Sequence, residues 1–168
     1  DGRGMAQSMQ MALECSGLKA NQISYINLHG TATQTNDRAE DKAVVKIFGS
    51  STPCSSTKGW TGHTLGAAGI AEAIICSICL NNNFIPGSLN TCVLDSDFGS
   101  NIILENRTET LTYVLSNSFG FGGNNCSLIF GIHSYFIHKL SFSLLFKNLL
   151  NCVDLSASTL LTPAAIDD

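Results

Sequence analysis

Three short loops punctuated by glycine carry the residues of this 168-residue chain that could do chemistry. They read His29-Gly-Thr-Ala-Thr33, Lys58-Gly-Trp-Thr-Gly-His63 and Asn117-Ser-Phe-Gly-Phe-Gly-Gly123. An imidazole changes its charge near neutral pH, and a lysine ammonium can bias the protonation of its neighbours. Taken singly, each residue has an ordinary interpretation, because a histidine before a glycine is commonly a hydrogen-bonded turn residue and a lone lysine is commonly a surface charge.

Each of these loops follows a predicted strand. The β-branched and aromatic run 23–28 predicts a strand that ends at His29, a short strand at 54–56 leads into the lysine loop, and a strand at 113–117 leads into the third loop. In layered α/β domains, side chains on loops at strand ends gather at one crevice. We therefore expect the two histidines and the lysine to meet.

Helical patterns separate the predicted strands. Residues 5–18 and 37–48 have helical spacing and end near Gly17 and Gly49, and residues 65–80 are apolar and almost without charge. The third segment is short for a membrane span and carries Glu72 near its middle, which favours a buried helix. With a final strand at 126–131, the pattern predicts a layered α/β domain over 1–131, followed by an unassigned tail, 132–168.

Composition excludes several classes of function. Apolar residues make up 44% of the chain and suit a globular domain, whereas 13% charged residues and a net charge of −4 argue against a nucleic-acid partner. Seven irregularly spaced cysteines with no signal peptide do not fit a secreted disulfide framework, so we expect core thiols in a reducing cytoplasm and no metal site. The first residue is Asp1, which indicates a piece of a longer protein.

Taken together, the three loops resemble a known family. His29-Gly-Thr-Ala-Thr33 followed by Asp37 and Glu40, then Ser55-Ser-Thr-Lys58 with Thr61-Gly-His63, then Asn117 to Gly123 resemble the elongating β-ketoacyl-acyl carrier protein synthases of the KAS I/II type in order and spacing. The resemblance covers about residues 1–131. It implies a thiolase-like fold, of which this chain is the C-terminal half of the layered αβαβα architecture.

The resemblance also implies a reaction. In that family a cysteine in the first half takes an acyl chain as a thioester, malonyl-acyl carrier protein loses CO₂, and the resulting carbanion attacks the thioester. His29 and His63 match the two catalytic histidines, whose N–H groups would stabilise the enolate oxygen. Lys58 matches a lysine that orients its neighbours, and we do not assign it as the proton-transferring base.

Further site residues follow from the same resemblance. Phe121 matches an aromatic residue that gates the nucleophile, and Thr31 and Thr33 match positions that contact the phosphopantetheine arm. Glu72 matches a carboxylate of a polar network that includes Asn27 and Ser116 and that holds a structural cation in some members.

The resemblance implies partners as well as chemistry. The acyl carrier protein would bring phosphopantetheine with it, so no cofactor of the chain's own is expected, and the complete enzyme would be a cytoplasmic homodimer. No cysteine here lies in a strand-to-helix elbow suited to the nucleophile, so the N-terminal half must supply it and this chain alone should be inactive. Two alternatives stay open: a non-catalytic chain-length or docking subunit, and a truncated gene product.

Two departures from the family pattern bear on the substrate. The family's Pro-x-Gly-Asp is replaced by Gln34-Thr-Asn-Asp37, and Trp60 adds bulk between the lysine and the second histidine. The elongating chemistry is therefore expected in fatty-acid biosynthesis or in a polyene or polyketide branch.

Overall fold

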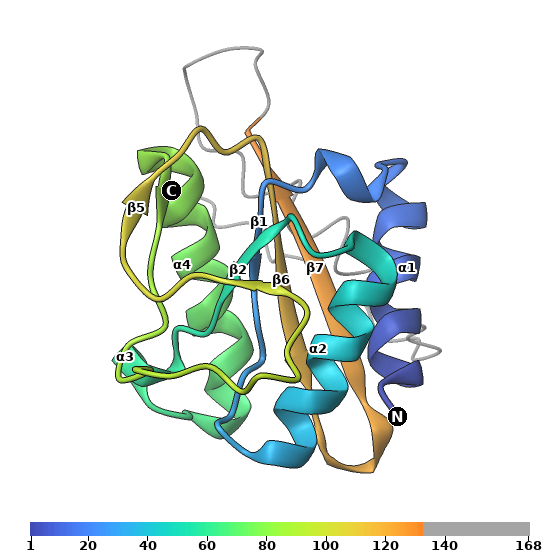
Figure 1. The fold of residues 1–168 in the computed structure, drawn as a ribbon. Coiled ribbons are helices and arrows are strands. Elements are labelled where there is room, and N and C mark those ends of the chain that lie inside the picture. Colours follow the sequence, from blue (N-terminus) through green and yellow to red (C-terminus); the bar gives the residue numbers. More distant parts are fainter. Residues whose placement is uncertain (133–168) are drawn as a thin grey trace, which may run out of the picture. The chain divides into compact units, whose positions relative to one another are not determined.

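The chain's structure is a computed structural model, and it describes residues 1–132 (Figure 1). These residues, Asp1–Ile132, form one compact unit. The predicted tail, 132–168, lies outside the described residues except for Ile132, so the domain boundary at residue 131 stays a prediction.

A five-stranded sheet forms the middle of this unit, in the order β4-β2-β1-β6-β7. The strands β4, β2, β1 and β6 are parallel, and β7 runs antiparallel to β6. A separate antiparallel ribbon pairs β3 with β5. The bounds of the strands are β1 Tyr25–Asn27, β2 Pro53–Ser55, β3 Phe84–Ile85, β4 Asn101–Ile102, β5 Arg107–Thr108, β6 Tyr113–Phe119 and β7 Asn125–Gly131.

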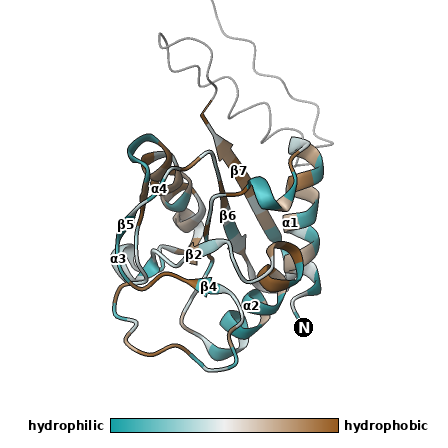
Figure 2. Ribbon diagram, turned by 45° about the horizontal axis from the view of Figure 1, so that its top comes forward, coloured by the Kyte–Doolittle hydropathy of each residue, from teal (hydrophilic) through white to brown (hydrophobic). Residues whose placement is uncertain are grey.

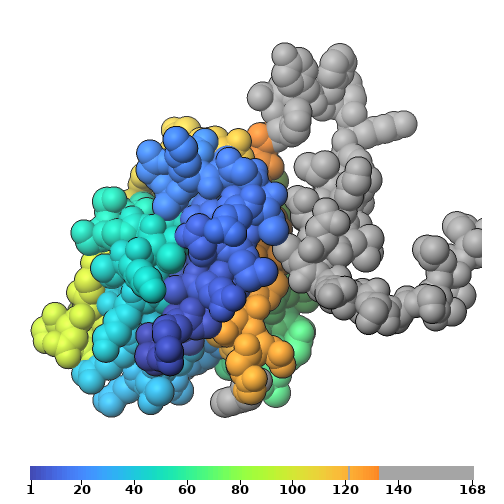
Figure 3. All heavy atoms as spheres, turned by 90° about the vertical axis from the view of Figure 1, so that its right-hand side faces the viewer, coloured from blue at the N-terminus to red at the C-terminus, as the bar shows by residue number. Residues whose placement is uncertain are grey.

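Helices cover both faces of the sheet because side chains of successive strand residues point to opposite sides. On one face, Ile26 and Leu115 pack in a cluster with α1 (Arg3–Ser16) and α2 (Gln34–Phe48). On the other face, Tyr25 and its neighbour Val114 pack against α4 (Ala68–Asn82). Figure 3 shows α1 in blue and α2 in cyan side by side over the first face. The predicted α/β class is therefore confirmed.

The apolar helix predicted at 65–80 lies against the sheet as expected. It begins as a 3₁₀ turn at Leu65–Ala67 and continues as α4. Cys76 and Leu80 are buried in the cluster on that face, while Ile70, Ile74 and Ile78 are more than half exposed on the opposite side of the helix. By length and composition alone, Leu65–Asn82 could also cross a membrane. Brown, apolar stretches mark this helix in Figure 2.

Several short elements were not expected from the sequence. The lysine loop contains a single helical turn, α3 (Lys58–Thr61). The segment predicted as mostly loop, 81–101, contains β3 and the beginning of β4. Each of these elements has two to four residues, which is too short for a periodic pattern to register.

Replacement of Leu115 by alanine tests the packing of the central strands. Leu115 is fully buried on β6, so Leu115→Ala should lower the free energy of unfolding by about 2–5 kcal/mol, because the lost contacts leave a cavity. Urea unfolding followed by circular dichroism measures the change. Val93→Ala is the matched control, since Val93 is 86% exposed. A loss for Leu115→Ala no larger than that of the control would contradict this packing.

Candidate active site

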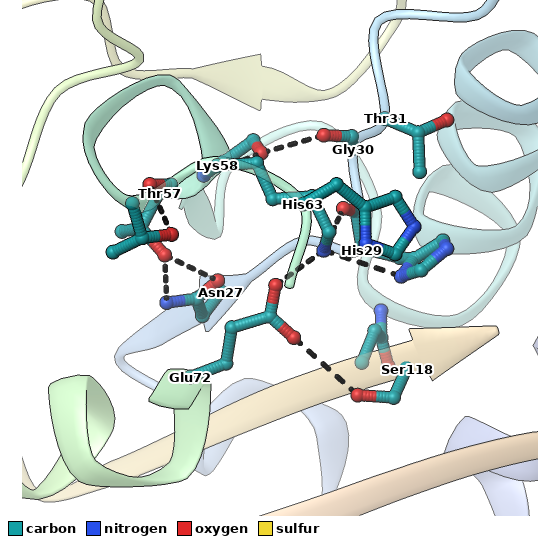
Figure 4. Close-up of polar contacts among 12 residues, drawn as sticks. Asn27, His29, Gly30, Thr31, Thr57, Lys58, His63, Glu72 and Ser118 are labelled. Carbon is teal, nitrogen blue, oxygen red and sulfur yellow. Dashed lines mark hydrogen bonds and ion pairs between the residues drawn. The ribbon is translucent and has the colours of Figure 1, made fainter. Parts of the chain in front are cut away.

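The predicted histidine and lysine loops meet at the carboxyl ends of β1, β2 and β6 (Figure 4). The Leu28 N–H donates to the Ser55 carbonyl at 2.9 Å, which holds β1 against β2 up to the residue before His29. The rings of His29 and His63 stand edge to face with their centroids 5.7 Å apart. Residues 34 positions apart in the sequence therefore share one site, as the order of elements predicted.

Lys58 lies beneath the histidines and is 9% exposed. Its ammonium donates hydrogen bonds to the Glu72 carboxylate and to the His29 carbonyl oxygen, and its Nζ lies 3.3 Å from His29 Nδ1. Because an ammonium has donors only, Nδ1 of His29 must accept and the ring proton must sit on Nε2. Burial, followed by the nearby charge of Lys58, lowers the pKa of His29 to about 4. At neutral pH His29 is therefore a neutral donor.

Glu72 reaches this site from α4 and is 2% exposed. One carboxylate oxygen accepts from Lys58, and the other accepts from the Ser118 hydroxyl at 3.4 Å. Burial raises the pKa of Glu72, and the hydrogen bond from Lys58 opposes that rise. The ion pair is shielded from water, so removing one partner would leave the other charge uncompensated.

His63 is held by the backbone that follows it. The Leu65 N–H donates to His63 Nδ1 at 3.2 Å, and Leu65 has a φ of +51°, a left-handed conformation that is uncommon for leucine. This bond places the proton of a neutral His63 ring on Nε2. Both histidines therefore present an Nε2–H donor at the same site, and His63 lies on its exposed side.

Glu40 is a site residue for which no separate role was expected from the sequence. It is 2% exposed on α2, and its two carboxylate oxygens accept the backbone N–H groups of His29 and Gly30, each at 2.8 Å. Asn117 Nδ2 adds a third hydrogen bond at 3.2 Å. The available signal was a charged residue on the buried face of an amphipathic helix, beside Ala43 and Val44. Burial raises the pKa of Glu40 to about 7, against the hydrogen bonds from Gly30 and His29.

Gly30 is required by this close packing. Its φ is +37°, and a Cβ there would lie 2.5 Å from the Cβ of Ser56. The Ser56 hydroxyl donates to the Gly30 carbonyl at 2.7 Å. A side chain at position 30 would push the histidine loop, residues 29–33, away from the lysine loop.

The two predicted pantetheine-binding threonines lie at the edge of the site. Their hydroxyls are 3.0 Å apart, with Thr31 half-buried and Thr33 exposed. The Thr31 N–H donates to Asp37 Oδ1 at 3.1 Å, which fixes this end of the histidine loop to α2. The side chain of Phe121 lies outside the part of the chain that the structure describes. Its backbone belongs to a 3₁₀ turn, Phe121–Gly123.

The predicted network of Glu72, Asn27 and Ser116 draws on helix α4 for Glu72 and on two neighbouring strands for the other two, and the hydrogen bonds of Asn27 and Glu72 go to other residues. Asn27 and Ser116 are partners in the pairing of β1 with β6, and both are buried. Asn27 bonds to the Thr57 hydroxyl at 3.1 Å, whereas Glu72 bonds to Lys58 and Ser118. Within residues 1–132 no group of three or more His, Cys, Asp or Glu side chains could hold a metal ion.

A pocket of about 380 Å³ adjoins the site. Lys58 and His63 line it, together with Gly30, Thr31 and Ala32. Residues of the segment 88–102, among them Leu89, Leu94 and Phe98, form a further part of the lining, which we call the far wall. The site therefore joins polar donors to a partly apolar chamber large enough for a small substituent.

The opposed pKa shifts of Glu40 and His29 predict a pH effect. Glu40 has a folded pKa of about 7, above its usual 4.5, so its contribution to stability falls as pH rises between these values. His29 has a folded pKa of about 4, below its usual 6.5, so its contribution rises over 4 to 6.5. The two contributions oppose one another between pH 4.5 and 6.5.

Glu40→Gln should expose the His29 contribution. The free energy of unfolding of this variant should rise more steeply with pH from 4 to 6.5 than that of the unaltered chain. Urea unfolding at half-unit pH steps measures both slopes. Glu105→Gln, a change at an exposed loop residue, is the control. Equal slopes in the unaltered chain and Glu40→Gln would show that Glu40 does not oppose His29.

Comparison with known proteins identifies relatives of this arrangement. The family model "Beta-ketoacyl synthase, C-terminal domain" matches residues 1–92. The 3-oxoacyl-[acyl-carrier-protein] synthase 1 of Escherichia coli (strain K12) is 44% identical over 130 residues, which are 76% of this chain and 31% of the relative. The chain thus spans about a third of the length of the curated relatives it matches.

Solved structures match the same region. A β-ketoacyl synthase from Burkholderia phymatum STM815 is 43% identical with a TM-score of 0.75, covering 77% of this chain and 32% of that one. A ketosynthase from Xenorhabdus doucetiae, in complex with its chain length factor, is 43% identical with a TM-score of 0.74, covering 78% and 34%. These matches confirm the expected thiolase-like fold, and the chain belongs to the β-ketoacyl synthase family through that family's C-terminal domain.

Proposed function

We propose that this chain provides the decarboxylating half of a 3-oxoacyl-acyl carrier protein synthase, an acyltransferase that lengthens acyl chains by two carbons. One observation carries the proposal: the rings of His29 and His63 have centroids 5.7 Å apart, and the Nδ1 of each faces a protein donor, so each ring presents its Nε2 to the site. Donors fixed before the reaction stabilise developing negative charge far better than water does.

In the proposed reaction, the bond between C2 of malonyl-acyl carrier protein and its carboxylate breaks, and CO₂ leaves. The electron pair of that bond forms an enolate whose oxygen accepts hydrogen bonds from His29 and His63. C2 then attacks the carbonyl carbon of an acyl-cysteine thioester, the new carbon–carbon bond forms, and the cysteine leaves as a thiolate. Lys58 keeps His29 neutral and orients it, and we assign Lys58 no proton-transfer step.

The nucleophile is proposed to come from the N-terminal half of the synthase. Burial raises the pKa of Cys54 to about 12 and that of Cys79 to about 11, and it also raises the pKa of Cys76. An attacking cysteine needs the opposite shift. Cys15 is on α1, Cys92 is in an exposed loop and Cys126 is on β7, while Cys152 lies outside the described residues. On this basis the isolated chain should not condense acyl groups.

The acyl carrier protein is the proposed donor partner. Thr31 and Thr33 offer hydroxyls at the mouth of the site for its phosphopantetheine arm, and Phe121 would close over the nucleophile. Phosphopantetheine enters with the carrier, so the chain needs no cofactor of its own. Fatty-acid synthesis fits the named activity of the curated relatives, and the similarity to a ketosynthase with a chain length factor keeps a polyene or polyketide branch open. A cytoplasmic location is part of the proposal.

The exposed stripe on α4, defined by Ile70, Ile74 and Ile78, is the proposed contact with the N-terminal half. These side chains are 58%, 55% and 52% exposed and lie one helical turn apart. A row of exposed isoleucines on a helix marks a face that another element covers. The complete enzyme is further proposed to be a homodimer.

The presence of the buried polar site residues argues against a non-catalytic docking subunit. Such a subunit has no need for a lysine buried under a histidine, because burying a charge is costly unless the charge is paired. Here Lys58, Glu72 and His29 are all present and mutually bonded.

Removal of either histidine tests the proposed function. In the complete synthase containing this chain, His63→Ala and His29→Ala should each slow decarboxylation of malonyl-acyl carrier protein about a hundredfold or more, because one donor to the enolate is lost. Release of ¹⁴CO₂ measures this rate, and acyl loading of the cysteine should change far less. Glu105→Gln is the control. Unchanged CO₂ release in both histidine variants would refute the assignment.

A charge on α4 tests the contact with the N-terminal half. Ile74→Glu should prevent co-purification of this chain with a separately expressed N-terminal half, because the carboxylate would be buried without a partner. Val93→Glu places the same charge at an exposed position away from α4 and should leave co-purification intact. Equal recovery of the two variants would show that the stripe is not the contact.

A further inference from the structure

Helix α2 holds two different loops through four polar side chains in neighbouring turns. Asp37 and Glu40 accept backbone N–H groups of the histidine loop, residues 29–33. Arg38 and Asp41 instead bind the segment 95–100, of which Phe98 and Ser100 line the pocket, as Asp41 itself does. One rigid helix therefore sets the position of both sides of the cavity.

Asp41 is the stronger of the two attachments to the far wall. It is 7% exposed, and its carboxylate accepts the Gly99 N–H at 3.1 Å, the Ser100 N–H at 2.9 Å and the Ser100 hydroxyl. Hydrogen bonds to a charged acceptor are stronger than neutral ones, and burial protects them from water. Gly99 also approaches α2 closely, because a Cβ there would lie 3.2 Å from Cγ2 of Val45.

Arg38 makes a weaker, exposed attachment. Its guanidinium bonds to Asp95 at 2.9 Å and lies 3.7 Å from Asp97, but its side chain is 49% exposed. Ion pairs in such positions contribute about 0–1 kcal/mol and are screened by salt. The position of the far wall therefore depends mainly on Asp41.

The segment that Asp41 holds carries apolar side chains into the pocket. Phe98 immediately precedes Gly99, and Phe98 and Leu94 line the same cavity as Lys58 and His63. In Figure 3 the yellow-green loop that contains this segment lies beside α2. If the attachment is released, these side chains move relative to His29, whose backbone N–H Glu40 holds independently.

We propose that Asp41 is a positioning residue for the donor substrate. By fixing the segment 99–100 to the helix that also fixes His29, it sets the width of the pocket between the histidines and the apolar wall. That width determines how closely the carrier-borne malonyl group is held. The inference rests on the proposed condensing function and adds a determinant of substrate fit that lies outside the histidine and lysine loops.

The test compares three variants in the complete synthase containing this chain. Asp41→Ala removes the acceptor, Asp41→Asn keeps one acceptor oxygen, and Lys42→Ala changes the exposed neighbouring residue of α2 as the control. Steady-state kinetics with malonyl-acyl carrier protein give KM and kcat separately. Amide hydrogen–deuterium exchange by NMR reports on the N–H groups of Gly99 and Ser100, with His29 and Gly30 as internal references.

For Asp41→Ala we expect a KM raised about three- to tenfold with kcat changed less than about twofold, which corresponds to the loss of one or two net hydrogen bonds. The amides of Gly99 and Ser100 should exchange about tenfold faster or more, while those of His29 and Gly30 stay protected. Asp41→Asn should give intermediate values, and Lys42→Ala should match the unaltered protein.

Two results would overturn the proposal. Unchanged exchange at Gly99 and Ser100 in Asp41→Ala would show that Asp41 does not hold the wall. Faster exchange with an unchanged KM, whether or not kcat falls, would show that the wall does not determine how the malonyl group fits the pocket. An unaltered synthase without condensing activity would refute the proposed function and the substrate role together, while the exchange rates would still decide whether Asp41 anchors the wall.

Discussion

The buried ammonium of Lys58 is the interaction on which the site depends. Its donors reach the Glu72 carboxylate, the His29 carbonyl oxygen and His29 Nδ1, so it ties together α3, α4 and the end of β1. This arrangement fixes the tautomer of His29, and burial followed by the charge of Lys58 lowers its pKa. The neutral ring therefore donates through Nε2. The ion pair with Glu72 is what makes a buried lysine tolerable in a crevice between helices and a sheet.

Helix α2 contributes the second constraint, which acts on the backbone. Glu40 receives the N–H groups of His29 and Gly30, so the left-handed turn at Gly30 is held without any contact to the imidazole itself. The neighbouring turn of the helix holds the far wall of the pocket through Asp41. The His29 donor and the Gly99–Ser100 segment beside the pocket are thus positioned by one element, α2.

Much of this arrangement was predictable from the sequence, and the reasons are local. The apolar periodicity of α1, α2 and α4 and the β-branched runs of β1 and β6 follow directly from burial on one face or both. The meeting of His29, Lys58 and His63 followed from loops at strand ends. The roles of Glu40, Asp41 and Leu65 did not, because they depend on contacts up to 59 residues apart or on a φ angle that leucine rarely adopts. The side chain of Phe121 lies outside the described residues, so its gating role stays a prediction.

The central claim is that His29 is a neutral Nε2–H donor at the pH of the reaction and that His63, whose Nδ1 accepts from Leu65, also donates through Nε2. ¹⁵N chemical shifts of the two imidazoles, recorded in the complete synthase between pH 4 and 8, test it most directly. The account predicts that His29 keeps a protonated Nε2 and an unprotonated Nδ1 down to about pH 5, consistent with its pKa of about 4, and that neutral His63 has the same tautomer. A His29 ring that titrates near pH 6.5, or an Nδ1–H tautomer in either ring, would contradict it.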